Sequence, residues 1–278
     1  MPGSNARALD KARSLPADVL LLDLEDAVHP EAKGEARRLV REELGRGGYG
    51  GRELVVRVNG LDTPFGADDL EMASTSGAHA VLLPKVESAS ALREAEEKLV
   101  LAGAPPELAL WAMVETPRGV LAVAEVAAAS PRLRCLVAGT SDLVKDLRAR
   151  HTPLRLEVLA SLSLVVLAAR ARGLAALDGV HLDLADEAGF EASCRQGADL
   201  GFDGKTLIHP KTIEVANRIF GPSAEAVDRA RRTIAAHEEA RSRREGIAVV
   251  DGRLVEALHV EEARRLVALA AAIEERER

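Results

Sequence analysis

The strongest constraint on the fold is a regular alternation of short apolar runs with segments of helical spacing, which continues to about His209. The runs are continuously apolar, as expected for strands that are buried on both faces of a parallel sheet. They begin at Asp18, Glu53, Ala80, Leu108, Cys135, Ala175 and Gly204. Strict alternation of strands and helices, repeated this often, favours a closed (β/α)8 barrel, the TIM barrel, over an open sheet.

The number of strands leaves one position of such a barrel open. We find about seven strand-like runs, whereas a (β/α)8 barrel requires eight. Only Met1, Pro2 and Gly3 precede the first expected helix, Ser4–Ser14. The first strand is therefore predicted to be truncated. Three possibilities stay open at this point: the strand is missing from this chain, its start lies elsewhere than we place it, or its position is filled in another way.

The chain changes character beyond His209. The pattern predicts a short helix over Pro210–Phe220 and a long charged helix from Ser223 to about Arg244. A hairpin over Ile247–Val255 should turn at Asp251–Gly252, a favoured turn pair, before a final helix over about Val260–Glu275. We therefore expect a barrel domain over 1–220 and an extension over 221–278 that acts as a lid on a neighbouring subunit.

Composition excludes several classes of function. The formal net charge of −7 and the isoelectric point of about 5.6 argue against a general surface for nucleic acids or anionic membranes. The two cysteines, Cys135 and Cys194, are too few for a disulfide framework or a zinc site, and we interpret both as reduced core thiols. No signal peptide and no apolar run of about 18 residues is present, so we expect a cytoplasmic protein.

The segment from Leu108 to Asp142 carries the most distinctive polar residues. It holds two strand-like runs separated by one helix, and each run ends in a turn with a carboxylate, Glu115 in VETP and Asp142 in GTSD. The carboxyl ends of neighbouring barrel strands lie side by side, so the two carboxylates should face one another. Magnesium takes one or two protein oxygens and leaves its other positions to water and substrate. The segment therefore predicts a magnesium site.

Other strand ends add charge to the same rim. These residues are Glu25, Asp26, Arg57, Asn59, Lys85 and His209. Working residues of barrel enzymes lie at the carboxyl ends of strands, and several acids and bases that converge there need a ligand or metal to balance them. The guanidinium of Arg57 can grip a carboxylate or an enolate oxygen. We expect His209, in contrast, to hold the neighbouring loop by hydrogen bonds.

A series of motifs, taken together, resembles one family. They are PGSNARALDKA, DVLLLDLEDAV, VVRVNG, LLPKVES, MVETPRGV, GTSDL and GFDGKTLIHPKTIEVANRIFGPS, and they occur in this order over essentially the whole chain. In combination they resemble the citrate lyase β-subunit-like branch of the HpcH/HpaI aldolase family. The resemblance implies a (β/α)8 barrel that binds Mg²⁺, or Mn²⁺, and acts on CoA thioesters and 2-oxo acids. It also implies a homo-oligomer, a trimer or a hexamer formed by two trimers.

The resemblance also implies roles for individual residues. Glu115 and Asp142 would be the metal ligands, and Arg57 would stabilise the thioester enolate or a substrate oxygen. Glu25 and Asp26 would lie beside the water molecules of the metal. Arg7 and Lys11, four residues apart near a helix N-terminus, would approach the phosphates of CoA. Glu256, in the tail segment VVDGRLVEALHVEEARRL, matches the position at which many relatives carry an aspartate that protonates the enolate carbon.

Three activities follow from the resemblance. The first is a magnesium-dependent lyase that cleaves malyl-CoA or citramalyl-CoA into acetyl-CoA and a 2-oxo acid by Claisen-type chemistry. The second is a (3S)-malyl-CoA thioesterase on the same scaffold, because the sequence around Glu256 looks most like that of a subgroup that includes such enzymes. The third is a citrate lyase β subunit that acts within a complex on an acyl-carrier-protein thioester; a chain with its own lid speaks against it.

Overall fold

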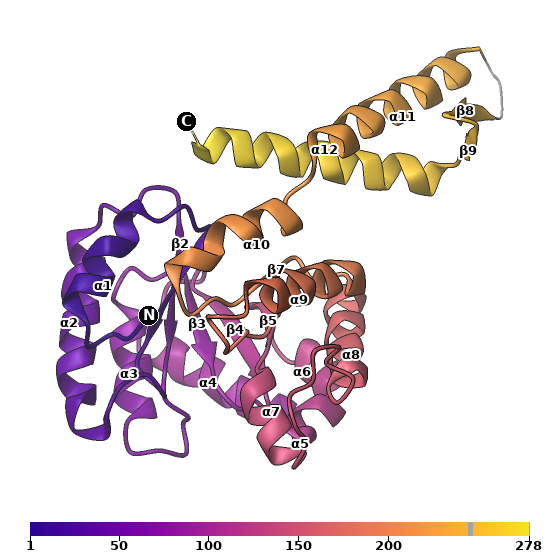
Figure 1. Ribbon diagram of the computed structural model, residues 1–278. Coiled ribbons are helices and arrows are strands. Elements are labelled where there is room, and N and C mark those ends of the chain that lie inside the picture. Colours follow the sequence, from indigo (N-terminus) through magenta and orange to yellow (C-terminus); the bar gives the residue numbers. More distant parts are fainter. Residues whose placement is uncertain (244–246, 278) are drawn as a thin grey trace. The chain divides into compact units, whose positions relative to one another are not determined.

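Seven parallel strands form one sheet in the order of the sequence (Figure 1). This computed structural model describes residues 1–243 and 247–277. The strands are β1 (Val19–Asp23), β2 (Glu53–Arg57), β3 (Ala80–Leu83), β4 (Ala109–Val114), β5 (Leu133–Ala138), β6 (Ala175–Asp178) and β7 (Gly204–Lys205). Sequential pairing of parallel strands is the winding of a TIM barrel, and it differs from doubly wound sheets, in which the strand order reverses. The predicted α/β class with a parallel, TIM-barrel-like sheet is confirmed.

Side-chain alternation along these strands creates the barrel interior. Every second residue points to one face of a strand. The interior cluster contains Val55, Ala80, Leu82, Trp111, Met113, Cys135 and Val137, with Val19, Leu21, Ala109 and Leu177 packed against it. The intervening residues, such as Leu22, Val56, Val81 and Leu110, are buried on the other face of the strands. Cys135 and Cys194 are both free and buried, as predicted.

Helices connect successive strands and surround the sheet in Figure 1. Several have caps that the sequence signals: Ser88 before α4 and Thr116 before α5 each accept a hydrogen bond from a backbone N–H of the first helical turn. The helices up to residue 220 are α1 (Ala6–Lys11), η1 (Ala12–Ser14), η2 (Pro30–Ala32), α2 (Lys33–Arg46), α3 (Gly66–Ser74), α4 (Ala89–Leu101), α5 (Pro117–Leu121), α6 (Val123–Ala127), α7 (Thr140–Asp146), α8 (Leu159–Ala171), α9 (Glu187–Leu200), η3 (Pro210–Thr212) and α10 (Ile213–Phe220).

The first three residues lie beside β1. Pro2 forms a parallel bridge with Asp23. The N–H of Asp23 donates to the carbonyl of Met1 over 2.9 Å, and the N–H of Gly3 donates to the carbonyl of Asp23 over 2.7 Å. In the described residues, the position of the expected first strand is held by this single bridge. The first three residues fill the edge of β1 opposite β2, although they are too short to form a strand.

A buried ionic cluster ties β6 and β7 to the loop before α8. Asp178 is fully buried; it accepts two hydrogen bonds from Arg155 at 2.8 Å and one from Lys205 at 2.7 Å. Burial lowers the pKa of Lys205, although Asp178 opposes that shift. The helix α8 begins only at Leu159, after this loop. Arg155 adopts a left-handed conformation with φ of 52° to reach Asp178, which a helix cannot include.

The chain divides into two compact units, Met1–Ala216 and Asn217–Arg278. The second contains α11 (Ala224–Ser242), the antiparallel strands β8 (Ala248–Val250) and β9 (Arg253–Val255), and α12 (Ala257–Glu277). The hairpin turns at Asp251 and Gly252, whose φ angles of 47° and 75° are those of a type I′ turn. Arg244, where we expected α11 to end, lies outside the described residues.

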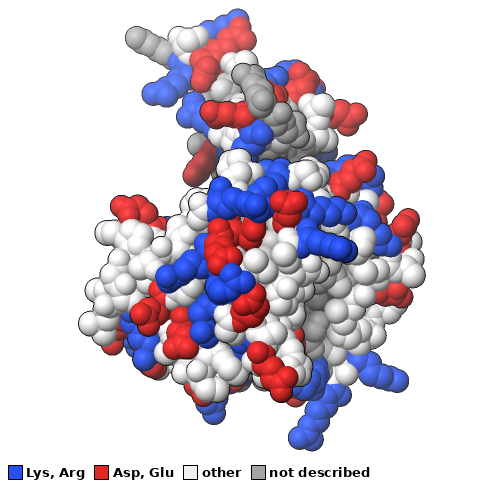
Figure 2. All heavy atoms as spheres, turned by 90° about the vertical axis from the view of Figure 1, so that its left-hand side faces the viewer, with Lys and Arg blue, Asp and Glu red and all other residues white. Residues whose placement is uncertain are grey.

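Two observations concern the surface. No helix in the described ranges is long and apolar enough to cross a bilayer. Figure 2 shows acidic and basic side chains interspersed on the face that it presents. On that face, the described residues form no extended surface of one sign.

The ionic cluster yields a stability prediction. Asp178→Ala leaves Lys205 and Arg155 without their shared carboxylate, and breaking a buried pair in this way costs about 3 to 5 kcal/mol. We expect urea unfolding to show a loss of this size. Glu94→Ala is the control: it removes an exposed pair with Lys98 on α4 and should change the free energy of unfolding by less than about 1 kcal/mol. A similarly small effect of Asp178→Ala would contradict the assignment.

Candidate active site

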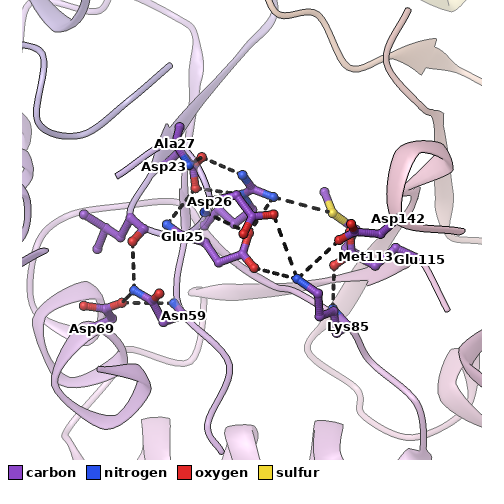
Figure 3. A network of polar contacts seen from close by, with 12 residues as sticks. Asp23, Glu25, Asp26, Ala27, Asn59, Asp69, Lys85, Met113, Glu115 and Asp142 are labelled. Atoms are coloured by element: carbon purple, nitrogen blue, oxygen red, sulfur yellow. Dashed lines mark hydrogen bonds and ion pairs between the residues drawn. The ribbon is translucent and has the colours of Figure 1, made fainter. Parts of the chain in front are cut away.

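The alternation that builds the barrel interior also aims polar side chains into its mouth. Val19 and Leu21 face the interior, so Asp23 and Glu25 follow on the same side. Arg57 follows Val55 in the same way, and Glu115 follows Met113. Where the strands end, the lining therefore changes from apolar to charged. Figure 3 shows the side chains of Asp23, Glu25, Lys85, Glu115 and Asp142 converging from the ends of β1, β3 and β4 and from the start of α7.

Arg57 is held by two carboxylates. Its Nε and Nη2 donate to Asp23 over 2.7 and 2.5 Å, a bidentate pair, and its Nη1 lies 2.9 Å from Oε2 of Glu25. Burial favours the protonated carboxyl of Asp23, but the hydrogen bonds from Arg57 outweigh it and lower the pKa of Asp23. The guanidinium is therefore fixed before any ligand arrives. Asp23 was not among the predicted site residues; its signal was its position on the inward face, two residues before Glu25.

Lys85 links both sides of the mouth. Its Nζ lies 2.8 Å from Oε1 of Glu25, 3.3 Å from Oδ2 of Asp142 and 3.9 Å from Oδ2 of Asp26 (Figure 3). Partial burial lowers the pKa of Lys85, but the surrounding carboxylates, Glu25 foremost, outweigh burial and raise it. Lys85 is therefore a cation. The sequence placed it at the rim without assigning it these partners.

Glu115 is the most deeply buried carboxylate of the predicted metal pair. Its side chain is 4% exposed, and its Oε1 accepts the backbone N–H of Lys85 over 2.8 Å. A Cβ at Gly139 would lie 2.3 Å from Cβ of Glu115, so only glycine leaves room for this side chain. Burial raises the pKa of Glu115 to about 7, and the nearby carboxylates Glu25 and Asp142 add to that rise. The carboxylate thus lacks a full counter-charge.

The donor set of Glu115 and Asp142 fits a magnesium ion. Asp142 lies in the first turn of α7 and shares the neighbourhood of Lys85 with Glu115. No group of three or more His, Cys, Asp or Glu residues arranged to hold a metal occurs in the part of the chain that the structure describes. Zinc sites usually need three or four such ligands, whereas magnesium is held by one or two carboxylates together with water and substrate. Glu115 is buried without a full counter-charge, and a magnesium ion would supply that positive charge.

A buried polar layer joins the ends of β1 and β2 to the helices α2 and α3. Nζ of Lys33 donates to the carbonyls of Leu24 and Glu25 and to Oδ1 of Asn59. Asn59 in turn donates to Asp69, which also binds Arg37. Asn59, predicted at the end of its strand, takes part in this layer. The buried lysine and aspartate on helices α2 and α3 gave no sequence signal, because charged residues are common on helix surfaces.

Three other predicted residues of the first unit, Arg7, Lys11 and His209, take no part in this cluster. Arg7 and Lys11 are exposed on α1, and neither forms a hydrogen bond or ion pair through its side chain within residues 1–243 and 247–277. Nδ1 of His209 accepts the N–H of Lys211, so His209 caps the turn that follows, as expected. Glu256 belongs to the second unit. It is exposed at the start of α12, and its N–H donates to Nδ1 of His259 over 3.0 Å.

A parallel barrel whose mouth holds a fixed arginine and a pair of carboxylates belongs to the class of barrel enzymes that work at the carboxyl ends of their strands. The profile of one family, HpcH/HpaI aldolase/citrate lyase, matches residues 1–210. This chain belongs to that family, which confirms the resemblance of its motifs.

Full-length relatives support the assignment. A (3S)-malyl-CoA thioesterase from Cereibacter sphaeroides is 51% identical over 98% of this chain and 93% of that protein. The citrate lyase subunit beta of Leuconostoc mesenteroides subsp. cremoris is 37% identical over 97% of this chain and 91% of its own length. The solved structure of CitE from Mycobacterium tuberculosis in complex with magnesium, acetoacetate and coenzyme A is 32% identical, with a TM-score of 0.76 over 98% of this chain and 96% of that one.

The raised pKa of Glu115 predicts a pH dependence of the metal-free protein. Between pH 4.5 and 7 the folded chain keeps a proton on Glu115 that the unfolded chain releases, so stability falls as the pH rises through this window. The loss amounts to at most about 3 kcal/mol. Urea unfolding in EDTA at pH 5 and pH 7.5 should show it. Glu115→Gln should flatten this difference; an equal slope in both proteins would exclude Glu115 as its source.

Proposed function

We propose that this protein hydrolyses a (3S)-malyl-CoA-type thioester with the help of Mg²⁺. The observation that carries this proposal is the 51% identity to a (3S)-malyl-CoA thioesterase over nearly the whole of both chains. The identity to citrate lyase β subunits, 34–37%, is clearly lower. The motifs alone ranked the lyase first; the relatives favour hydrolysis.

The geometry of the mouth suits this reaction. Water adds to the thioester carbonyl, the C–S bond breaks, and CoA leaves as a thiol while malate is formed. A magnesium ion held by Glu115 and Asp142 would act as a Lewis acid toward substrate oxygens. Arg57 would stabilise negative charge that develops on the thioester oxygen, because Asp23 has already fixed its orientation. Glu25, between Arg57 and Lys85, and the exposed Asp26 would orient the attacking water.

The second candidate is the lyase reaction, in which malyl-CoA or citramalyl-CoA yields acetyl-CoA and a 2-oxo acid. It is favoured by the solved relative that binds magnesium, acetoacetate and coenzyme A together. The same arginine would stabilise an enolate, and Glu256 would supply its proton. A citrate lyase β subunit that works on an acyl-carrier-protein thioester stays the third candidate; activity of the isolated protein on a CoA ester would argue against it.

The binding of CoA and the role of the tail are part of the same proposal. Arg7 and Lys11, exposed on α1, would pair with CoA phosphates. The extension would place Glu256 over the barrel of a neighbouring subunit in a trimer, or in a hexamer of two trimers. Glutamate is one methylene longer than the aspartate of many relatives, which would shift the carboxyl and favour activation of water over protonation of carbon.

Product analysis tests the proposed reaction. We expect the isolated protein, given (3S)-malyl-CoA and Mg²⁺, to release free CoA and malate in equal amounts, measured by thiol titration and mass spectrometry. EDTA should stop the release. Acetyl-CoA with glyoxylate, in place of these products, would overturn the thioesterase assignment and establish the lyase.

Mixing two inactive variants tests the shared site. Glu256→Ala and Arg57→Ala should each lower turnover at least about 100-fold, and Glu256→Ala should leave Mg²⁺ affinity unchanged. If the lid works in trans, oligomers reassembled from equal amounts of both variants regain about a quarter of the wild-type sites, because random assembly unites an intact barrel with an intact lid that often. Mixing without reassembly is the control. Mixed oligomers without recovered activity would place each Glu256 over its own barrel.

A further inference from the structure

The side chain of Lys85 occupies the space between the carboxylates of the mouth. Its Nζ contacts Glu25 at 2.8 Å and Asp142 at 3.3 Å, and Asp26 lies 3.9 Å away. Figure 3 shows the ammonium between the acidic side chains that come from β1 and those that come from β4 and α7. Lys85 is therefore the cation that the carboxylates share in this structure.

The backbone of Lys85 is held in an unusual conformation. Its φ of 47° lies in the left-handed region, which is unfavourable for a non-glycine residue. The N–H donated to Glu115 and the ion pairs of Nζ compensate for this cost. One residue thus contacts both proposed metal ligands, Glu115 through its backbone and Asp142 through its side chain.

Charge at the mouth is unbalanced even with Lys85 in place. Five carboxyl groups, those of Asp23, Glu25, Asp26, Glu115 and Asp142, face two cationic side chains that contact them, Arg57 and Lys85, and the Met1 ammonium, which acts on Asp23. Arg57 is committed to Asp23 and Glu25 and is nearly buried. The Lys85 side chain, in contrast, is 45% exposed and has a flexible stem. Lys85 contacts each carboxylate through its single ammonium group, so it can leave one of them and keep the others.

We propose that Lys85 is a placeholder cation that Mg²⁺ displaces from Asp142. This inference rests on the proposed metal site. In the metal-free protein, Nζ neutralises Asp142 and keeps the mouth from expanding through repulsion between carboxylates. When the metal enters, Nζ releases Asp142 and stays paired with Glu25 and Asp26, which already lie within 4 Å. Lys85 is then a positioning residue for Glu25, and its competition lowers the affinity of the site for Mg²⁺.

A purely structural role of Lys85 predicts the opposite effect on metal binding. If Nζ merely held Asp142 in place for the metal, its removal would weaken Mg²⁺ binding. If Nζ competes with the metal, removal of one positive charge beside the site strengthens binding. The hydrogen bond from the Lys85 backbone to Glu115 remains possible after any substitution of the side chain. The direction in which the Mg²⁺ affinity changes therefore distinguishes the two roles.

Calorimetric titration with Mg²⁺ in the absence of substrate makes this measurement. We expect Lys85→Met to bind Mg²⁺ at least about tenfold more tightly than wild type, since one close charge pair no longer opposes the metal. Lys85→Gln should behave alike. Lys145→Met, which removes an exposed charge from the same helix as Asp142, is the matched control and should change affinity less than about twofold. The Mg²⁺-induced rise in melting temperature should increase in the Lys85 variants.

The outcomes distinguish this inference from the proposed function. Unchanged or weaker Mg²⁺ binding by both Lys85 variants overturns the placeholder role and leaves the metal site intact. A wild-type protein that shows no Mg²⁺ binding, or binding that Glu115→Gln does not reduce, overturns the metal site and the placeholder role together.

Discussion

The alternation of side chains along parallel strands is the constraint on which this protein depends. The same face that buries Val55, Trp111 and Met113 in the barrel carries Asp23, Arg57 and Glu115 once the strands reach its mouth. A slip of one residue in any of these strands would turn its charged side chain toward the helices. The apolar core and the site are thus set by one register, and the packing of the lower barrel orients the chemistry above it.

Electrostatics at the mouth follows from this arrangement. Burial raises the pKa of the carboxyl groups, and neighbouring groups oppose this shift to different extents. Asp23 has a bidentate arginine and a lowered pKa, whereas Glu115 has one backbone hydrogen bond, a distant ammonium and a pKa of about 7. The two acids therefore stand ready for different tasks. Asp23 is paired with Arg57 and fixes its orientation. Glu115 has no such partner and is suited to bind a cation.

Much of the site was predictable because it depends on strand ends. Glu25, Asp26, Arg57, Lys85, Glu115 and Asp142 all follow apolar runs, and in a parallel barrel all strand ends meet at one rim. Asp23 and Gly139 were missed, since aspartates at the ends of strands and glycines in turns are common in proteins and seldom belong to a site. The support by Lys33, Asn59 and Asp69 was also missed, because its members come from a strand end and two helices whose contact no local pattern announces.

The sequence by itself determined the class of fold, the family and the list of charged strand ends. Hydrophobic periodicity and the order of motifs can be recognised along the chain without coordinates. Only the tertiary structure decided which charges pair. Bonds of Arg57 to Asp23 and of Lys85 to Glu25 join residues 34 and 60 positions apart. It also placed Met1–Gly3 beside β1 and delayed the start of α8 until after Arg155. Such choices depend on distances across the barrel, which the order of residues along the chain does not contain.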